Sequence, residues 1–356
     1  MTLTAPATSE IDSTITEVAV PTFAVIGGHE VDDHLAGREA ETIDVIRRTY
    51  LLHDAGETVN PPSYFLRFPD RPDNRIIALP ASVGGSVGID GVKWISSVPG
   101  NVAHGVPRAS AVTIINDPVT GYPLACVESA IISATRTAAS AALAAVELRD
   151  GRSFDRVAIV GGGLIARYVV RYLLAAGVAP GEIVVHDTSA EHGASFVDHL
   201  RRTHPGSSAR FTDDVTEAIG SSDLVVFTTV APEPYLDDPA LLGHRPLVLN
   251  LSLRDLGVSM VLAADNVVDD VEHCLKANTS VHLAEQHLGN RDFLTGTLAQ
   301  VVRGTVTLRA DRPTIFSPFG LGVLDLALAK QIYDDLATSG RLREVPDFYH
   351  DVRRLP

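Results

Sequence analysis

The segment RVAIVGGGLIA, residues 156–166, decides the fold of this chain. Its three β-branched residues, at 157, 159 and 160, predict a buried strand that runs directly into a glycine turn. The turn has the spacing G-x-G-x-x-A, the fingerprint of a dinucleotide-binding strand–turn–helix unit. The sequence therefore predicts a Rossmann-type domain. The alternative is a glycine-rich turn between a strand and a helix that binds nothing.

Each residue of this turn has its own expected task. Gly161 permits the tight turn, Gly163 lets a pyrophosphate approach the backbone, and Ala166 lets the helix pack closely on the strand. The helix that begins with Leu164 and Ile165 directs unpaired N–H groups at the phosphates. These residues are expected to bind the cofactor.

The cofactor choice is predicted by Asp187, which ends the next apolar run, EIVVHD, 24 residues after Gly163. An acidic residue at this place accepts hydrogen bonds from the adenosine ribose and repels a 2′-phosphate. Neither His186 nor Thr188 supplies a compensating cation. We therefore expect NAD rather than NADP.

Composition sets the protein class. With 356 residues the chain exceeds the size of a single core, so two domains are expected. The net charge of −15, without runs of Lys or Arg, argues against nucleic acid and anionic membranes as partners. We expect a cytoplasmic protein, because two isolated cysteines give no disulfide framework, the N-terminus lacks a signal peptide, and no unbroken apolar run is long enough to span a membrane.

The first part of the chain predicts a mostly antiparallel sheet. Residues 1–20 are polar and are expected to form a mobile arm. A short strand (23–28) and an amphipathic helix (31–55) follow, and an alanine-rich helix is expected over 129–148. The sheet itself is predicted from five short β-rich runs between residues 63 and 128: YFLRF, RIIALP, GVKWIS, AVTIIN and PLACVE.

From residue 156 onward, strands and helices are predicted to alternate, as a parallel sheet requires. A long helix is expected within the final segment, in FGLGVLDLALAKQIYDDLA. The fold class is therefore α/β, with a smaller α+β domain. The expected strands are RVAIV, EIVVHD, DLVVFTTV, PLVLNLS and NVVDD.

Lys93 is a candidate functional residue. Alternation within GVKWIS places it on the same face as Ile95 and opposite Trp94. A lysine among apolar side chains needs an anionic partner, either a substrate carboxylate or an internal acid, unless that face is solvated. Arg67 and Arg136 raise the same question, and without further information each is an ordinary salt-bridge partner.

Two other motifs carry little weight. GGSVG, residues 84–88, has the spacing of a nucleophile elbow, but a strand rather than a helix follows it, which argues against a hydrolase. His282 and Glu285 stand three residues apart without a third ligand nearby, so no metal site is predicted.

Five motifs in this order resemble the ornithine cyclodeaminase/mu-crystallin family: GVKWISSVPGN, INDPVTGYPLACVES, SATRTAASAALAA, VGGGLIA and NLSLRD. The resemblance covers nearly the whole chain. It implies a substrate and dimerisation domain (1–133), a Rossmann NAD-binding domain (134–312), and a C-terminal segment (313–356) that returns to the first domain. It also implies a homodimer and a reaction at the Cα–N bond of an amino acid.

Within the family, FLRFP, RIIALPAS, VHLAEQHLGNRDFLTGTL and IFSPFGLGVLD look like the N-(2-amino-2-carboxyethyl)-L-glutamate dehydrogenases. That group forms 2,3-diaminopropionate for siderophores and peptide antibiotics. The resemblance implies NAD-dependent cleavage of the glutamate conjugate to 2,3-diaminopropionate and 2-oxoglutarate. The alternatives are an ornithine cyclodeaminase or alanine dehydrogenase, and a non-catalytic ligand-binding protein.

The resemblance also implies roles for single residues. Arg67, Lys93 and Arg136 are expected to bind substrate carboxylates, and Lys93 to accept the amine proton if its pKa is lowered. Asp255 lies at the carboxyl edge of the parallel sheet, where it could deprotonate a water. The remaining expected cofactor contacts are Thr137, Thr228, Thr229 and Ser252.

The chain departs from the family pattern at two places. Ser317-Pro318 replaces a Lys-Ser pair, and Leu253-Arg254 replaces a glycine pair. The added cation at 254 is consistent with a substrate that carries an extra carboxylate.

Overall fold

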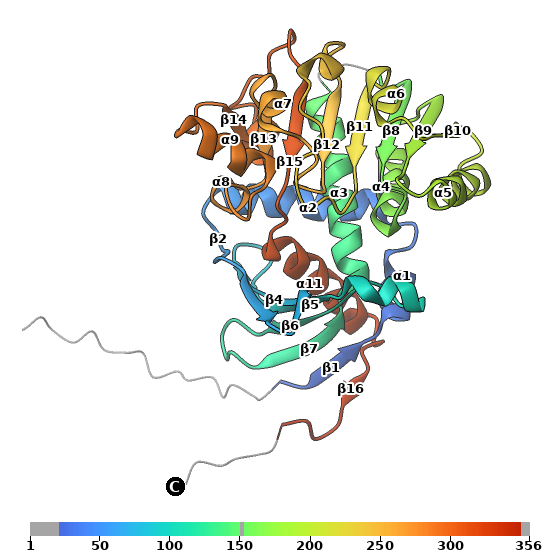
Figure 1. Cartoon of the computed structure of the whole chain (residues 1–356). Coiled ribbons are helices and arrows are strands. Elements are labelled where there is room, and N and C mark those ends of the chain that lie inside the picture. The colour runs from blue at the N-terminus through green and yellow to red at the C-terminus, as the bar shows by residue number, and fades with distance from the viewer. Residues whose placement is uncertain (1–20, 150–152, 350–356) are drawn as a thin grey trace, which may run out of the picture.

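The computed structural model describes residues 21–149 and 153–349, and it consists of two sheets joined by long helices (Figure 1). The arm predicted at residues 1–20 lies outside these residues. Each sheet has eight strands. The α/β fold class predicted from the sequence is confirmed.

The first sheet is mostly antiparallel, as predicted. Only the β1–β7 pair within it is parallel among the described residues. All five predicted β-rich runs are strands of this sheet. Its strands in spatial order are β16 (Glu344–Val345), β1 (Phe23–Ile26), β7 (Pro123–Glu128), β6 (Ala109–Asn116), β5 (Ile89–Ser97), β4 (Arg71–Val83) and β2 (Thr58–Val59), with β3 (Tyr64–Phe68) also paired to β4.

The inner face of this sheet packs against α11 (Gly322–Thr338), the long helix predicted near the C-terminus. Leu324, Leu326, Leu328 and Ile332 are buried. The C-terminal segment therefore completes the core of the first domain, although the second domain separates the two along the chain.

The second sheet is parallel throughout and carries the glycine turn at the end of its strand β8. All five predicted strands are present. In spatial order the strands are β10 (Ser208–Thr212), β9 (Glu182–His186), β8 (Arg156–Val160), β11 (Leu224–Phe227), β12 (Leu247–Asn250), β15 (Thr314–Ser317), β13 (Asp265–Val268) and β14 (Leu294–Thr297). The helices of this domain are α4 (Leu164–Ala175), α5 (Ala190–Thr203), α6 (Val215–Gly220), α7 (Val258–Leu262), α8 (Val271–Cys274), α9 (Ser280–Leu288) and α10 (Leu298–Val302).

Two details differ from the sequence-based expectations. β15 lies inside the second sheet, between β12 and β13, so the chain returns to the first domain after residue 317 rather than at 313. The helix expected over 31–55 is two helices, α1 (Gly28–Leu35) and α2 (Glu39–Asp54). They are separated at Gly37, whose φ of 75° is incompatible with a continuing right-handed helix.

The helix α3 (Ala130–Leu148) joins the two domains and packs against α2, α4 and α11 (Figure 1). Its length and composition would allow it to cross a membrane, but 67% of the apolar stretch is buried inside the protein. Small side chains, such as Ala138, Ala141 and Ala145, allow these helices to approach closely. α3 is therefore a core helix between the layers.

Candidate active site between the two domains

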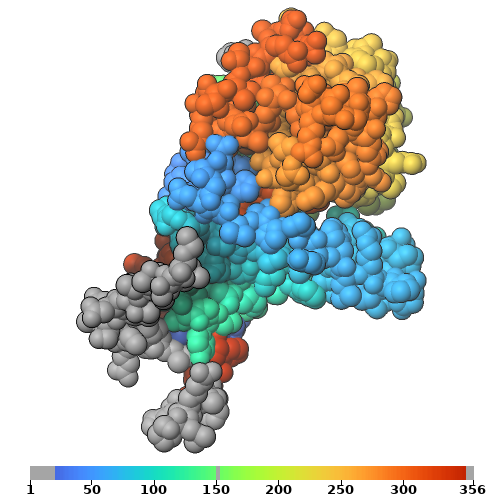
Figure 2. All heavy atoms as spheres, turned by 90° about the vertical axis from the view of Figure 1, so that its left-hand side faces the viewer, coloured from blue at the N-terminus to red at the C-terminus, as the bar shows by residue number. Residues whose placement is uncertain are grey.

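A cavity of about 760 Å³ lies between the two domains. Figure 2 shows the surface hollowed between the second domain and the light-blue projection formed around β3 and β4. The first domain, α3 and the 318–320 loop contribute Tyr50, Pro72, Asp73, Arg75, Pro99, Val102, Arg108, Arg136, Thr137, Ser140, Pro318, Phe319 and Gly320. The second domain contributes Ile165, Thr228, Thr229, Val230, Ala231, Pro232, Leu251, Ser252, Leu253 and Arg254.

The glycine turn has the geometry that a pyrophosphate requires. Gly161 has a φ of 97°, and a Cβ there would lie 2.9 Å from the carbonyl carbon of Thr228, so only glycine fits. A Cβ on Gly163 would meet open space. Gly163 is also the N-cap of α4 and makes no side-chain cap, which leaves the first N–H groups of the helix available to a phosphate. The residues present therefore fit a dinucleotide.

Asp187 lies beside this turn, immediately after β9. Its carboxylate accepts hydrogen bonds from the N–H of Gly162 (2.8 Å) and of Ser189 (2.9 Å). These bonds fix a carboxylate next to the turn, where the adenosine ribose of a bound dinucleotide lies in this fold.

Of the other expected cofactor residues, Leu164 is 59% exposed and does not line the cavity. The rest lie after β11 and β12 at the carboxyl edge of the same sheet, on α3 or at the start of α4. Thr137, Ile165, Thr228, Thr229 and Ser252 all line the cavity. The Thr228 hydroxyl donates to the Gly161 carbonyl (2.7 Å), which ties the end of β11 to the glycine turn. The structure thus brings this part of the predicted set together.

Lys93 is buried, and its anionic partner is an internal acid, Asp325 of α11. The Nζ atom lies 2.7 Å from Asp325 Oδ2 and 3.4 Å from the Ser133 hydroxyl. Burial lowers the pKa of Lys93 to about 8; Asp325 opposes this shift, and the nearby Arg136 guanidinium adds to it. A substantial fraction of Lys93 is therefore neutral in mildly alkaline solution.

Arg136 of α3 shares the same acid and lines the cavity, whereas Lys93 does not. Its Nε lies 3.4 Å from Asp325 Oδ2. A Cβ on Gly320 would lie 2.6 Å from an Nη atom of Arg136, and Gly320 has a φ of 94°. Glycine at 320 thus lets the loop before α11 pack directly on the guanidinium.

Arg67 does not line this cavity. It lies on the exposed strand β3, with its guanidinium 5.2 Å from the centre of the Phe65 ring. It is paired across the hairpin with Arg75 of β4, so the two side chains leave the same face of the sheet. Arg75, and not Arg67, reaches the cavity in this structure.

Asp255 is fully buried, behind two residues that line the cavity. Its carboxylate accepts hydrogen bonds from the hydroxyls of Thr229 (2.6 Å), Tyr235 (3.0 Å) and Ser252. Burial, together with the charge of Asp255, raises the pKa of Tyr235 well above its usual value. Because Thr229 and Ser252 donate to the acid, their oxygen lone pairs remain available to groups in the cavity.

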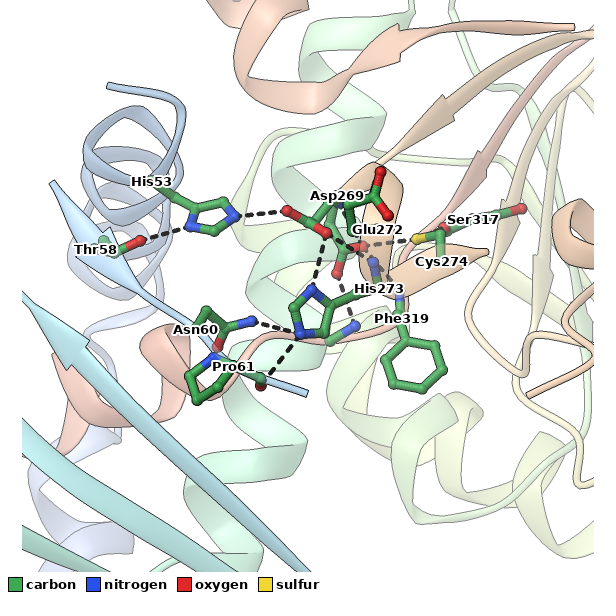
Figure 3. A network of polar contacts seen from close by, with 12 residues as sticks. His53, Thr58, Asn60, Pro61, Asp269, Glu272, His273, Cys274, Ser317 and Phe319 are labelled. Carbon is green, nitrogen blue, oxygen red and sulfur yellow. Dashed lines mark hydrogen bonds and ion pairs between the residues drawn. The ribbon is translucent and has the colours of Figure 1, made fainter. Parts of the chain in front are cut away.

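A second polar network, shown in Figure 3, supports the loop before α11. Asp269 accepts hydrogen bonds from the N–H groups of Phe319 (2.9 Å) and Gly320 (2.7 Å), which line the cavity. The neighbouring Asp270 contacts His273 of α8 (2.9 Å) and His53 of α2 (3.0 Å). Asp270 thus joins α8 of the second domain to the end of α2.

Sequence reasoning missed several of these residues. Asp325 carried a signal, since it is a lone acid among the apolar residues of GVLDLALA. Arg75 and Arg108 carried none, because local sequence does not separate a cavity arginine from a surface one. His282 and Glu285 have surface roles: His282 Nδ1 accepts from the N–H of Asn278, and Glu285 pairs with Arg291.

Comparison with known proteins identifies the family. The model of the ornithine cyclodeaminase/mu-crystallin family matches residues 25–340. The N-((2S)-2-amino-2-carboxyethyl)-L-glutamate dehydrogenase of Staphylococcus aureus is 31% identical over 301 residues, which cover 82% of this chain and 88% of that protein.

Solved structures agree on the architecture. An archaeal alanine dehydrogenase dimer with bound NAD has a TM-score of 0.80 and 25% identity, covering 92% of this chain and 99% of that one. The Δ1-pyrroline-2-carboxylate reductase of Thermococcus litoralis, in complex with NADH and L-proline, has a TM-score of 0.83 at 21% identity, covering 90% and 100%. With the family model spanning both sheets and the cavity between them, this chain belongs to the ornithine cyclodeaminase/mu-crystallin family.

Proposed function

We propose that this enzyme oxidises N-(2-amino-2-carboxyethyl)-L-glutamate with NAD and water, and releases 2,3-diaminopropionate, 2-oxoglutarate and NADH. The observation that carries the proposal is a cavity beside the glycine turn that is lined by four arginines: Arg75, Arg108, Arg136 and Arg254. The substrate has three carboxylates, which need several cationic donors. The similarity to the Staphylococcus aureus dehydrogenase supports this substrate over others.

The reaction class and the cofactor follow from the family. The chain is an oxidoreductase and NAD is its cofactor, as the family and the alanine dehydrogenase structure with bound NAD indicate. Both sequence-based predictions are confirmed. Bound beside the glycine turn, NAD would supply the hydride acceptor for oxidation at the glutamate Cα of the substrate, and water would then hydrolyse the oxidised carbon–nitrogen bond.

Arg136 and Lys93 are proposed to orient the reacting glutamate unit. Arg136 presents donors to the cavity, and Lys93 lies behind it, joined to the same carboxylate of Asp325. Lys93 is also proposed to take the proton of the secondary amine, because nitrogen must be neutral to release electrons toward the new double bond. Arg67 stays a proposed carboxylate ligand. To bind a substrate in the cavity, it would require a movement of the β3–β4 hairpin toward the second domain.

Asp255 is proposed to receive the proton of the attacking water indirectly. The acid does not line the cavity, but Ser252 and Thr229 do, and both hydroxyls donate to it. A water held by Ser252 can pass a proton to that hydroxyl as the hydroxyl passes its own to Asp255. The proton therefore leaves the cavity through one serine or threonine.

One assay tests the proposed reaction against the alternative, an ornithine cyclodeaminase. The protein is incubated with NAD and either the glutamate conjugate or L-ornithine, and reduced nicotinamide is followed by absorbance. Stoichiometric NADH and 2-oxoglutarate from the conjugate support the proposal. Proline and ammonia from ornithine, without net NADH, would overturn it.

A homodimer is also proposed, since an apolar row crosses the outer face of the first sheet. Tyr64, Ala78, Trp94 and Val112 are register partners on four adjacent strands. The three larger side chains are 67%, 45% and 37% exposed. A second copy of the chain would cover this row in a closed, symmetric pair.

The cellular setting is part of the proposal. We place the enzyme in the cytoplasm, where the free cysteines Cys126 and Cys274 stay reduced. Its 2,3-diaminopropionate would supply siderophore or peptide-antibiotic assembly. A gene for a phosphoserine-dependent synthase beside this one would support that setting, and genes of arginine catabolism would oppose it.

A further inference from the structure

Within the part of the chain that the structure describes, three arginines of the cavity have no acidic partner. Among residues 21–149 and 153–349, no carboxylate forms an ion pair with Arg75, Arg108 or Arg254. Asp73 is the single acid in the described lining. This is unexpected in a chain with 44 acidic and 29 basic residues.

The three charges lie close to one another. Arg75 is paired with Ser97 at the end of β5, and the carbonyl of Arg108 accepts a hydrogen bond from Val98, the next residue (2.8 Å). Arg254 reaches the cavity from the opposite domain. Partial burial and the charge of Arg75 lower the pKa of both Arg108 and Arg254. Like charges held together in this way repel unless an anion lies between them.

The loop that carries Arg254 contains a residue with an unfavourable backbone conformation. Leu253 has a φ of 77°, in the left-handed region that a bulky side chain rarely adopts. Two guanidinium nitrogens of Arg254 donate to the carbonyl of Ala277, at 2.7 and 3.2 Å. The side chain is thus held in place, with one terminal nitrogen free of these bonds.

We infer that Arg75, Arg108 and Arg254 form a second carboxylate subsite that selects substrates with additional carboxylates over simple monocarboxylic amino acids. Arg136, which shares Asp325 with the buried Lys93, binds the carboxylate next to the reacting carbon, whereas these three arginines bind the distal ones. The inference rests on the proposed function only for the identity of the substrate. The subsite itself would bind any di- or tricarboxylate of suitable length.

The test compares two ligands that differ only in the distal group. Calorimetry measures the Kd of 2-oxoglutarate and of 2-oxopentanoate, in which a methyl replaces the second carboxylate, on the NADH-loaded protein. We expect wild type to favour 2-oxoglutarate by about 10- to 100-fold, the usual worth of a charge-assisted hydrogen bond. Arg75→Gln and Arg108→Gln should each lose most of this preference while 2-oxopentanoate binds as before.

Three control variants separate a distal carboxylate subsite from a general loss of ligand binding. Arg75→Lys should restore part of the preference, Arg136→Gln should weaken both ligands alike, and Arg202→Gln, an exposed arginine of α5, should change neither. Arg108 lies at the cavity wall and keeps much of its surface in solvent, so its substitution leaves the core intact. No preference in wild type, or equal weakening of both ligands in Arg75→Gln and Arg108→Gln, would overturn the inference. The proposed function alone would be overturned if wild type prefers 2-oxoglutarate and the two variants lose that preference, but the glutamate conjugate gives no NADH.

Discussion

Lys93 of β5 and Asp325 of α11 form a buried ion pair, with 2.7 Å between Nζ and Oδ2, directly behind Arg136, one of the arginines that line the cavity. The pair joins the sheet to the helix that completes it. It also sets the protonation of Lys93, since burial favours the neutral amine and Asp325 favours the charged one.

The first prediction concerns the pH dependence of oxidation. If Lys93 is the base, it must be neutral, so kcat/KM should rise with pH through an apparent pKa of about 8. Asp325→Asn removes the charge that raises this pKa, so the acidic limb should move to lower pH. Initial rates of NADH formation between pH 6 and 10 measure both profiles.

A matched control removes a neutral contact of the same lysine. Ser133→Ala deletes the 3.4 Å hydroxyl contact to Nζ without changing any charge, so its acidic limb should stay in place. Circular dichroism verifies that Asp325→Asn is folded. An unshifted limb in folded Asp325→Asn would mean that another group titrates.

The second prediction concerns the dimer. Trp94 stands in the middle of the exposed apolar row, and Trp94→Lys places a charge where the second copy is proposed to pack. The loss of a central aromatic anchor costs about 2 kcal/mol or more of association free energy. Light scattering at micromolar concentration should give twice 37.9 kDa for wild type and a smaller mass for the variant.

Leu288→Lys is the control for this change. Leu288 is 40% exposed on α9 of the second domain, away from the row, so its substitution should leave the mass unchanged. A wild-type mass of about 38 kDa would rule out the dimer itself.

The parts of the fold that sequence predicted best are those whose cause is local. The strand, turn and helix of residues 156–166 are specified by contiguous residues. The position of Asp187 is local as well, because it directly follows the apolar run of the next strand. β15 was missed because TIFS is a four-residue run beside a proline, and its strand identity comes from the neighbours β12 and β13. β10 was missed for a similar reason, as SARFT is short and carries a charge.

The chemistry of the site is less local than its backbone. Lys93 and Asp325 are 232 residues apart in the sequence. The sequence therefore indicated that Lys93 needs an anionic partner, but it did not indicate which acid that partner is. Arg67 and Arg75 are opposite one another in a single hairpin, and only the placement of that hairpin against the second domain decides which of them reaches the cavity. Asp255 was expected at the carboxyl edge of the sheet as the base for a water, but three hydroxyls surround its carboxylate and it does not line the cavity.

The third prediction concerns cofactor choice. Asp187 should make NAD the preferred cofactor, because its carboxylate accepts from ribose hydroxyls and repels a 2′-phosphate. Asp187→Ser combined with Thr188→Arg should lower kcat/KM with NAD by about tenfold or more and raise it with NADP. Asp198→Asn, at an exposed acid of α5, is the control. Equal efficiency of wild type with the two cofactors would contradict the assignment.

The fourth prediction concerns stability at the junction of α2 and α8. Burial opposes the charged form of His273, but its hydrogen bond to Asp270 raises the net pKa above 6.5; Lys276 works weakly against this. Burial likewise opposes ionisation of Asp270, but hydrogen bonds from His273 and His53 hold its pKa well below the usual range. Asp270 therefore stays ionised throughout the neutral range.

The sign of the effect follows from these shifts. A raised pKa stabilises the folded protein below the unfolded value of 6.5, and this contribution is lost as pH rises through the folded value. His273→Gln should therefore lower the melting temperature by a few degrees at pH 6, and by less at pH 8.5. His192→Gln, at an exposed histidine of α5, should not show this pH dependence. Thermal unfolding of the three proteins at both pH values measures it, and an equal loss at both would mean that His273 contributes through packing rather than charge.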